Sequence, residues 1–364
     1  MKRLMSGNAA LGEAAVLSGC TCYFGYPITP QNELTEYMAK RMAEVGGVFI
    51  QSESEIAAIN MVLGASVAGA RAMTSSSGPG ISLKQEGISY LAADELPAVV
   101  VNIMRGGPGM GNISPSQSDY FQATRGGGHG DYRTIVLAPS SVQELTEVVP
   151  LAFDLADKYR NPVIILGDGM LGQMMEPVDF DNLKRPADYE KDYILTGAKG
   201  RPARKVHSLI FDTKLQEEHN WKLFRKFQLM EQNEVRYETY LTEDAEMVVV
   251  AYGMGARIVK GAIKRLREDN LKVGMLRPIT LWPFPAKVLQ EMAKTVSDFF
   301  VVEMSTGQMV EDVKLALQGA ARVHLYGRPG GVIPTPVEIY RIISRHYYHA
   351  QSGNAQAGSR GARS

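Results

Sequence analysis

The chain has 364 residues, and its 39 lysines and arginines balance 39 aspartates and glutamates, so that the formal net charge is zero. A neutral chain argues against a nucleic-acid-binding protein that neutralises phosphates, and 45% apolar with 21% charged residues excludes disorder over most of the chain. No apolar run approaches the roughly 18 residues of a membrane-spanning helix, and the first residues lack the apolar core of a signal peptide. We therefore expect a cytoplasmic protein that contacts no membrane.

Helix-like and strand-like segments alternate over residues 8–168. Helical spacing of apolar residues predicts helices over 8–18, 31–44, 53–68, 81–93 and 142–159. Apolar and β-branched runs predict strands over 20–26, 47–51, 71–76, 97–104, 133–138 and 162–166. Because strands that alternate with helices form βαβ units, this part of the chain predicts an α/β domain with a doubly wound parallel sheet.

A second α/β unit follows a long connector. Residues 179–245 break the alternation and contain a charged, helix-like stretch over 214–238, whose polar side we expect to face solvent, with a partner surface as the alternative. Strands are then predicted over 246–251, 272–276, 299–302 and 323–326, and helices over 257–268, 286–295, 308–318 and 336–346. The predicted division is 1–178, 179–245, 246–348 and a disordered tail over 349–364, which is rich in Gly, Ser, Ala and Gln.

The chain has two cysteines, Cys20 and Cys22, in an apolar strand-like run. Two cysteines cannot form a disulfide framework, a four-cysteine zinc site or a self-contained iron–sulfur cluster. We interpret both as small buried hydrophobic residues. If the protein takes part in electron transfer, another chain must carry the clusters.

Two glycine motifs resemble cofactor-binding loops without completing them. Gly253-Met254-Gly255 is followed by Ile258 where a dinucleotide-binding loop carries its third glycine. Gly167-Asp168-Gly169 resembles the start of a motif that holds Mg²⁺ on a diphosphate, but Asn182 follows too early to be its second ligand. We interpret both motifs as turns next to strands and His129 as an ordinary loop histidine, and we predict no metal site within this chain.

Glu55 stands where a short predicted strand gives way to a helix of small residues. The sequence Ser52-Glu53-Ser54-Glu55 fits a capping box, in which Ser52 is the N-cap and Glu55 reaches back to the Ser52 amide. A carboxylate at a helix start can instead face a ligand, since the helix dipole stabilises its charge there. The two interpretations compete for the same side chain.

Two loops at the same predicted sheet edge carry further polar side chains. Arg105 ends the most apolar strand and enters a glycine-rich loop over 106–111, and Thr29 lies between prolines in Tyr26-Pro27-Ile28-Thr29-Pro30. Open α/β sheets bind ligands beyond the carboxyl ends of their strands, and a guanidinium group suits a carboxylate. The alternatives are a solvated loop arginine and a structural proline turn.

Four motifs occur in a fixed order: Tyr26-Pro27-Ile28-Thr29-Pro30, Glu53-Ser54-Glu55-Ile56-Ala57-Ala58, Thr74-Ser75-Ser76-Ser77-Gly78-Pro79-Gly80 and Arg105-Gly106-Gly107-Pro108. Together they resemble the alpha-type, pyrimidine-binding subunit of 2-oxoacid:ferredoxin oxidoreductases, and the resemblance continues through 276–285 and 302–308. The connector and the Gly-Met-Gly loop look most like the branched-chain group, which acts on 2-oxoisovalerate (3-methyl-2-oxobutanoate). The resemblance implies a doubly wound thiamine-diphosphate-binding pyrimidine-type domain and a transketolase C-terminal-like α/β domain.

The resemblance also implies a heteromeric enzyme. In this family a beta subunit holds the diphosphate and Mg²⁺ of thiamine diphosphate, and a gamma subunit and a ferredoxin-like delta subunit complete the complex. Iron–sulfur clusters are accordingly expected only on the other subunits. The implied reaction is the oxidative decarboxylation of a 2-oxoacid to an acyl-CoA and CO₂, with coenzyme A as co-substrate and ferredoxin as electron acceptor.

The functional residues of the family correspond to residues of this chain. Glu55 is implied as the carboxylate that exchanges a proton with the aminopyrimidine of thiamine diphosphate, with Glu53 as the alternative. Thr29 is implied to hydrogen-bond the 2-oxo group of the substrate, and Arg105 is implied to pair with its carboxylate. Further cofactor contacts are implied for Pro27, Ile28 and Gly78.

The resemblance leaves alternatives for substrate and role. Family members that act on 2-oxoglutarate carry Ser-Thr after the Gly-Pro of the arginine loop, whereas Gly109-Met110 stand here, and a flexible thioether suits an apolar substrate tail. The alternatives are a 2-oxoglutarate:ferredoxin oxidoreductase subunit, a non-catalytic scaffold subunit of the same fold, and a self-sufficient thiamine enzyme. The last of these needs the Mg²⁺ motif that the chain does not complete.

Overall fold

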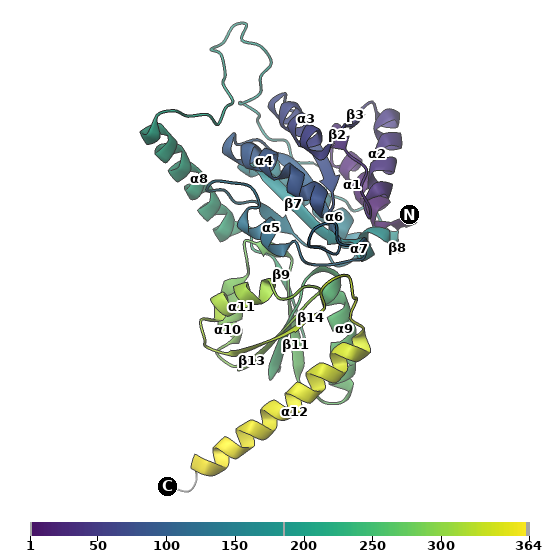
Figure 1. Ribbon diagram of the computed structural model, residues 1–364, viewed down its shortest axis with the longest axis vertical. Coiled ribbons are helices and arrows are strands. Elements are labelled where there is room, and N and C mark those ends of the chain that lie inside the picture. The colour runs from purple at the N-terminus through teal and green to yellow at the C-terminus, as the bar shows by residue number, and fades with distance from the viewer. Residues whose placement is uncertain (1, 185, 362–364) are drawn as a thin grey trace.

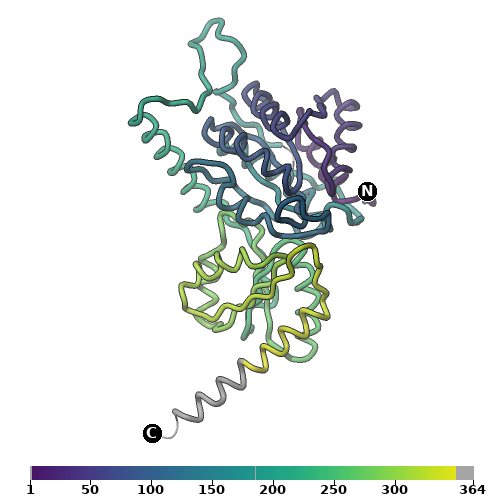
Figure 2. The backbone as a smooth tube through the Cα atoms, in the orientation of Figure 1, coloured from purple at the N-terminus to yellow at the C-terminus, as the bar shows by residue number. Residues whose placement is uncertain are grey.

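The structure is a computed structural model that describes residues 2–184 and 186–361, with side chains described as far as His349. It contains two α/β units, one above the other in Figure 1, with the N-terminal unit at the top. The backbone trace shows the connector projecting from the first unit and returning through a long helix (Figure 2). Within the described residues no helix is both long and apolar enough to cross a bilayer.

The first unit is built on a seven-stranded sheet with the strand order β12-β6-β7-β5-β4-β2-β3. Its strands are β2 (Cys22–Gly25), β3 (Val48–Gln51), β4 (Ala72–Ser76), β5 (Ala98–Met104), β6 (Ile135–Leu137), β7 (Pro162–Asp168) and β12 (Thr280–Trp282). All neighbours are parallel except β12, which runs antiparallel to β6. Every residue of β4, β5, β6 and β7 is buried, as expected for a parallel sheet covered on both faces.

Helices cover both faces of this sheet. They are α1 (Gly7–Leu17), α2 (Asn32–Val45), α3 (Glu55–Val67), α4 (Pro79–Ala93), α5 (Tyr120–Arg125), α6 (Val142–Tyr159) and α7 (Gly169–Gln173). Helix α1 packs against α2 and α6, whereas α3 packs against α4, so that two helical layers enclose the strands (Figure 1). A Cβ atom at Gly87 would lie 2.5 Å from the Ile59 side chain, so the close approach of α3 and α4 requires a glycine there. The predicted doubly wound α/β architecture is confirmed.

The second unit has a five-stranded sheet with the order β14-β13-β10-β11-β9. Its strands are β9 (Tyr237–Tyr240), β10 (Met247–Val250), β11 (Val273–Pro278), β13 (Asp298–Glu303) and β14 (Arg322–Gly327), of which β9 alone is antiparallel to its neighbour. The remaining helices are α8 (Thr213–Asn233), α9 (Gly253–Glu268), α10 (Ala286–Met292), α11 (Met309–Leu317) and α12 (Pro336–Gly361). The second α/β unit is therefore present as predicted.

Some short elements differ from the prediction. Strands β1 (Arg3–Ser6) and β8 (Met175–Val178) form a two-stranded antiparallel sheet that the sequence did not indicate, because four residues are too few to show a periodicity. The disorder expected of the tail over 349–364 stays a prediction: α12 spans Pro336–Gly361, and residues 362–364 lie outside the described part.

Strand β12 ties the two units together. It belongs to the stretch 246–348 that the sequence assigns to the second domain, yet it pairs with β6 of the first sheet, and the Ala138 amide donates to the Ile279 carbonyl at 2.8 Å. Gln117 reinforces the junction. Its side-chain amide donates to the Tyr252 carbonyl at 2.9 Å and accepts from the Met304 amide at 3.0 Å. The Gly253 turn beside it opens α9 with φ +53°, as the interpretation of a tight strand-to-helix turn requires.

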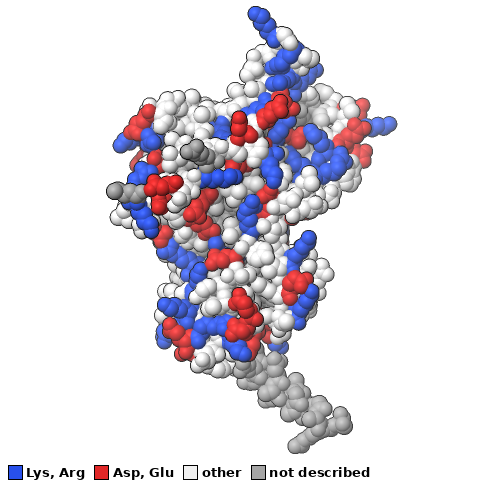
Figure 3. All heavy atoms as spheres, turned by 180° about the vertical axis from the view of Figure 1, so that it is seen from behind, with Lys and Arg blue, Asp and Glu red and all other residues white. Residues whose placement is uncertain are grey.

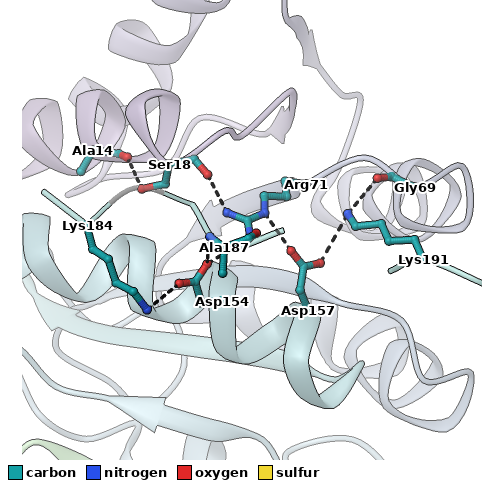
Figure 4. Close-up of polar contacts among 9 residues, drawn as sticks. All are labelled: Ala14, Ser18, Gly69, Arg71, Asp154, Asp157, Lys184, Ala187 and Lys191. Atoms are coloured by element: carbon teal, nitrogen blue, oxygen red, sulfur yellow. Dashed lines mark hydrogen bonds and ion pairs between the residues drawn. The ribbon is translucent and has the colours of Figure 1, made fainter. Parts of the chain in front are cut away.

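Ion pairs attach the start of the connector to the first unit (Figure 4). Arg71, just before β4, donates to Asp157 at 2.8 Å and to Asp154 at 3.1 Å, and both aspartates lie on α6. From the connector, Lys184 pairs with Asp154 at 3.0 Å and Lys191 with Asp157 at 3.4 Å. Arg71 bonds to both aspartates, so that the four pairs form one network. Because both aspartates are buried, these pairs differ from isolated ion pairs on the surface.

Helix α8 packs one apolar stripe against the first unit. Leu223, Phe227 and Met230 are buried, and the Phe227 ring stands edge-on to the Trp282 ring with centroids 6.4 Å apart. The opposite side is exposed and carries apolar residues such as Trp221 and Phe224 besides its charges, so that its contact with solvent rather than a partner stays a prediction. The helix ends at Asn233 rather than at 238, because β9 begins at Tyr237. Before α8 the connector projects from the molecule, and its tip over 199–205 is rich in Lys and Arg (Figure 3).

Candidate active site

The candidate site lies at the carboxyl ends of β5, β4, β2 and β3, which are neighbours in the first sheet. From β2 the chain crosses to β3 on one side, and from β4 it crosses to β5 on the other. The strand order therefore reverses between β2 and β4, and ligands of open α/β sheets bind at such a switch point. The loops that leave these strands carry the polar residues singled out in the sequence.

The capping-box interpretation of Glu55 is wrong. Ser54, not Ser52, caps α3, and its hydroxyl accepts a hydrogen bond of 3.1 Å from the Ala57 amide. The Ser52 amide and hydroxyl instead donate to the Gly25 carbonyl at 2.9 and 3.0 Å, which extends the pairing of β3 with β2 by one residue. The helix consequently starts two residues later than the box requires, and Glu55 is its first residue.

The Glu55 carboxylate faces the first turn of α4. A Cβ atom at Gly80 would lie 2.5 Å from Glu55 Oε1 and 2.1 Å from Ser76 Oγ, so the glycine makes room for both polar groups. Glu55 is 6% exposed, whereas Glu53 is exposed to solvent. Within the part of the chain that the structure describes, no donor hydrogen-bonds the Glu55 carboxylate. Its position therefore favours Glu55 over Glu53 as the carboxylate that faces a ligand.

Lys84 lies beneath Glu55 and was missed by the sequence analysis. Its side chain is 0% exposed, and its ammonium donates to Thr74 Oγ1 at 3.0 Å and to the Glu55 backbone carbonyl at 3.4 Å. Burial lowers the pKa of Lys84 to about 7, against the opposing attraction of the Glu55 charge. The sequence contains one indication that Lys84 is buried: it stands four residues from both Gly80 and Ile88, on the face of α4 that packs inward.

Arg105 and Thr29 meet at the same edge. The Arg105 guanidinium donates to the Thr29 carbonyl at 2.9 Å and to the Met110 carbonyl at 3.2 Å, which ties the two loops together. Arg105 is 7% exposed, so the interpretation as a solvated loop arginine is wrong. A Cβ atom at Gly78 would lie 3.3 Å from Arg105 Nε, so the guanidinium also borders the loop before α4.

A buried hydrogen-bond chain supports the Thr29 loop from below. The Tyr23 hydroxyl lies 2.6 Å from Ser75 Oγ, which donates to Gln31 Oε1 at 2.5 Å. The Gln31 side chain in turn donates to the Tyr26 carbonyl at 3.3 Å. The proline turn therefore has a structural role, and the half-buried Thr29 projects from a loop of fixed shape.

Several buried polar atoms around this edge lack a partner within the described residues. They are Ser76 Oγ, Ser77 Oγ and Arg105 Nε. Leaving a buried polar group unpaired costs about 1–3 kcal/mol, so their clustering indicates a place for a polar ligand. A carboxylate beside a glycine cradle, with unpaired hydroxyls next to it, fits a heteroaromatic ring that carries ring nitrogens and an amino group.

An apolar rim borders the polar centre. Exposed apolar side chains on the strand ends, loops and helix starts at this edge include Tyr26, Ile50, Ile56, Leu83, Met110 and Ile113. Exposed apolar residues around a polar site are typical of a surface that another protein covers. This edge of the sheet therefore has the composition of a protein-binding surface.

The remaining sequence motifs serve the structure. Asp168 caps α7, accepting from the Met170 and Leu171 amides at 3.0 and 3.1 Å, and burial raises its pKa to about 6. The predicted turn over 167–169 is instead a direct strand-to-helix junction, because Gly167 and Asp168 end β7 and Gly169 begins α7; the Asp168 carboxylate is used within the fold. The His129 carbonyl accepts from Ser89, and burial raises the pKa of the Cys20 thiol to about 12, which makes it an unreactive core residue.

One cluster of potential metal ligands lies away from this edge. Ligand atoms of Asp298, His324 and His346 are within 4.8 Å of one another. Arg322 already donates to both oxygens of Asp298, at 2.9 and 2.6 Å, and its positive charge opposes a cation. The sequence prediction that the chain holds no metal stays a prediction.

Comparisons with known proteins agree with the geometry. The family model for pyruvate flavodoxin/ferredoxin oxidoreductase, thiamine diphosphate-binding, matches residues 13–249, and the model for core domain II of pyruvate:ferredoxin oxidoreductase matches residues 245–339. Ketoisovalerate oxidoreductase subunit VorB of Methanothermobacter marburgensis is 52% identical over 94% of this chain and 97% of its own length. The 2-oxoglutarate synthase subunit KorA of Methanocaldococcus jannaschii is 39% identical over 93% of this chain and 98% of its own.

A solved structure shares the fold. It is a 2-oxoglutarate:ferredoxin oxidoreductase from Magnetococcus marinus with 2-oxoglutarate, coenzyme A and succinyl-CoA bound. The TM-score is 0.85 at 28% identity, and the match covers 95% of this chain but 65% of that one. The predicted fold class and family are confirmed: the chain belongs to the ferredoxin-dependent 2-oxoacid oxidoreductases, as an alpha-type subunit that carries their thiamine-diphosphate-binding domain.

Proposed function

We propose that this chain provides the proton-exchanging and substrate-binding half of an active site that oxidatively decarboxylates 3-methyl-2-oxobutanoate to an acyl-CoA and CO₂. The observation that carries the proposal is the convergence of Glu55, Arg105 and Thr29 on one edge of the sheet, beside the glycine cradle at Gly80. When bound, thiamine diphosphate supplies the electron sink for the carbanion that decarboxylation leaves.

Glu55 is the residue that handles the proton. Its carboxylate would bind at N1′ of the aminopyrimidine and exchange a proton at that atom. The unpaired hydroxyls of Ser76 and Ser77 are available to its polar substituents. Ile28, Pro27 and Gly78 would border the ring, because they belong to the loops that enclose the cradle. Burial of Glu55 keeps water from competing for this contact.

Arg105 and Thr29 are the residues that orient the substrate. Arg105 Nε has no partner among the described residues and remains a donor for the substrate carboxylate. Thr29 Oγ1 accepts a hydrogen bond of 3.3 Å from Asn32, which leaves the hydroxyl proton free to donate to the 2-oxo oxygen. Together they would hold the α-carboxylate and the carbonyl group in one orientation.

The branched-chain substrate is favoured by one residue and by the relatives. Met110 is exposed on the arginine loop, and its thioether suits an apolar substrate tail. The second carboxylate of 2-oxoglutarate would instead be stabilised by a positively charged side chain at this position. The VorB relative is 52% identical, against 39% for the KorA relative, which is named for 2-oxoglutarate. A 2-oxoglutarate substrate is the second candidate, since the solved relative binds that acid.

Partner chains complete the enzyme in this proposal. A beta subunit would bring the diphosphate site with Mg²⁺, because Asp168 is committed to capping α7. A ferredoxin-like delta subunit would carry the iron–sulfur clusters, since this chain has two cysteines, and a gamma subunit would complete the complex. The apolar rim around the site offers a surface for the beta subunit. We place the complex in the cytoplasm.

A substrate panel on the assembled complex tests this proposal. Reduction of a viologen dye is followed with pyruvate, 2-oxoglutarate, 3-methyl-2-oxobutanoate and indolepyruvate, each with coenzyme A. We expect the highest kcat/KM for 3-methyl-2-oxobutanoate. A preference for 2-oxoglutarate would support the second candidate. A scaffold subunit would give turnover that does not change when Glu55 or Arg105 is replaced.

A further inference from the structure

Lys84 has no part in the function proposed above, although it lies directly under Glu55. We propose that Lys84 is a positioning residue: it anchors the first turn of α3 and its charge sets how readily the Glu55 carboxylate takes up a proton. This inference rests on the proposed role of Glu55 and concerns the regulation of that same group.

The anchoring follows from the contacts of Lys84. Lys84 is on α4, and its ammonium reaches Thr74 on β4 at 3.0 Å and the Glu55 carbonyl at 3.4 Å. It therefore connects three elements at the point where α3 begins. Gly80, one turn earlier on α4, leaves the space that the Glu55 carboxylate occupies. One helix thus contributes both the cradle and the support.

The surroundings make Glu55 the natural charge partner of Lys84. The charged and titratable groups on the neighbouring elements include Glu55 on α3, Arg105 after β5, Asp168 on β7, Tyr23 on β2, Asp119 before α5, and His129, Asp131 and Tyr132 on the loop that packs against α4. Arg105 donates to two loop carbonyls, Asp168 accepts from the amides of α7, and Tyr23 bonds to Ser75. Of these groups only the Glu55 charge attracts the Lys84 ammonium appreciably.

Packing alone does not require a lysine here. Lys84 is 0% exposed, and a methionine of similar length would fill the same space without removing a charge from water. Burial brings the amine and ammonium forms of Lys84 close to balance near neutral pH. Each form favours a different state of the carboxylate: the ammonium favours the ionised form, and the amine favours the protonated one.

The first test observes Lys84 directly, without turnover. The full chain is labelled with [ε-¹³C]lysine, the Lys84 signal is assigned by its loss in Lys84→Met, and its titration is followed from pH 5.5 to 10. We expect a midpoint near neutral pH that falls by at least about half a pH unit in Glu55→Gln, because the attractive charge is gone. A midpoint like that of surface lysines, or one that does not change in Glu55→Gln, would overturn the inference.

The second test uses the assembled complex. The pH profile of kcat is compared for wild type, Lys84→Met, Lys84→Arg and the exposed control Lys40→Met. We expect the acidic limb to move to higher pH in Lys84→Met, and to return most of the way in Lys84→Arg, which keeps a cation. Superimposable profiles would contradict the inference. Full turnover of Glu55→Gln would instead contradict the proposed role of Glu55. The lysine titration would even then show whether the charges of Lys84 and Glu55 interact.

Discussion

The Arg105 guanidinium donates a 2.9 Å hydrogen bond to the backbone carbonyl of Thr29, 76 residues earlier in the chain. This bond joins the loop after β2 to the loop after β5 across β4, which lies between those strands in the sheet. Nε of the same guanidinium has no hydrogen-bond partner among the residues that the structure describes. Arg105 thus has two roles: it holds the two loops together, and its Nε is available to donate a hydrogen bond to an anion.

Replacing Arg105 should weaken substrate binding. In Arg105→Met, loss of a buried, charge-assisted contact should cost about 2–5 kcal/mol, or about 30- to 5,000-fold in kcat/KM. Arg105→Lys should recover only part of this, because an ammonium lacks the planar fork. Steady-state kinetics of the assembled complex measure the effect, with the exposed Arg225→Lys as control. Equal kcat/KM in wild type and Arg105→Met would exclude the carboxylate role.

Adding one methyl group at Gly80 should displace Glu55. A Cβ there would lie 2.1 Å from Ser76 Oγ and 2.5 Å from Glu55 Oε1, so the carboxylate must move in Gly80→Ala. We expect turnover to fall at least about tenfold if the carboxylate must be positioned for proton exchange. In the matched control, Gly64→Ala on α3, the new Cβ meets nothing within 4 Å, and it should stabilise the helix by about 0.5–1 kcal/mol. Thermal unfolding and turnover are measured together.

The buried Lys84 should make stability rise with pH. Its folded-state pKa is about 7 and its ordinary value is 10.5, so between these values the unfolded chain binds more protons than the folded one. The free energy of unfolding therefore gains up to about 1.4 kcal/mol per pH unit from this group between pH 7 and 10.5. Below pH 7 the contribution is constant.

Chemical denaturation of wild type and Lys84→Met from pH 6.5 to 9.5 measures this slope. The free energy of unfolding of wild type should rise with pH relative to that of Lys84→Met, since only wild type carries the titrating group. A difference that stays constant across this range would show that Lys84 titrates normally.

Replacing Gln117 should lower the free energy of unfolding, because its side chain bonds to two backbone groups of the second unit. Gln117→Ala leaves the buried Tyr252 carbonyl and Met304 amide without their side-chain partner, which should cost about 1–3 kcal/mol. The exposed Gln228→Ala should cost less than about 0.5 kcal/mol. Denaturant unfolding of both variants checks the difference, and equal losses would show that the junction between the units does not depend on Gln117.

The sequence predicted the elements that periodicity describes well. The continuous apolar run of β5 and the amphipathic α6 come out with nearly the predicted bounds, because burial on both faces or on one helical stripe leaves a clear pattern. β12 could not be predicted in this way. It has three residues, and its pairing with β6 depends on a contact between distant parts of the chain.

The site was harder to predict than the sheet. Whether Glu55 is a helix cap or faces a ligand depends on where α3 begins, and this is decided by the bonds of Ser52 to Gly25 on the neighbouring strand. Lys84 was missed because a lysine in a helix is usually solvated, and only the packing of α3 on α4 buries it completely. Such tertiary contacts are not visible in local sequence patterns.

The most direct test of the central claim compares two glutamates two residues apart. Viologen reduction with 3-methyl-2-oxobutanoate is measured for the assembled complex carrying wild type, Glu55→Gln or Glu53→Gln. Because Glu55 is buried beside the cradle and Glu53 faces solvent, turnover should fall at least about 100-fold in the first variant and stay within about twofold in the second. A Glu55→Gln complex that keeps most of its turnover would contradict the assignment of the proton-exchanging carboxylate.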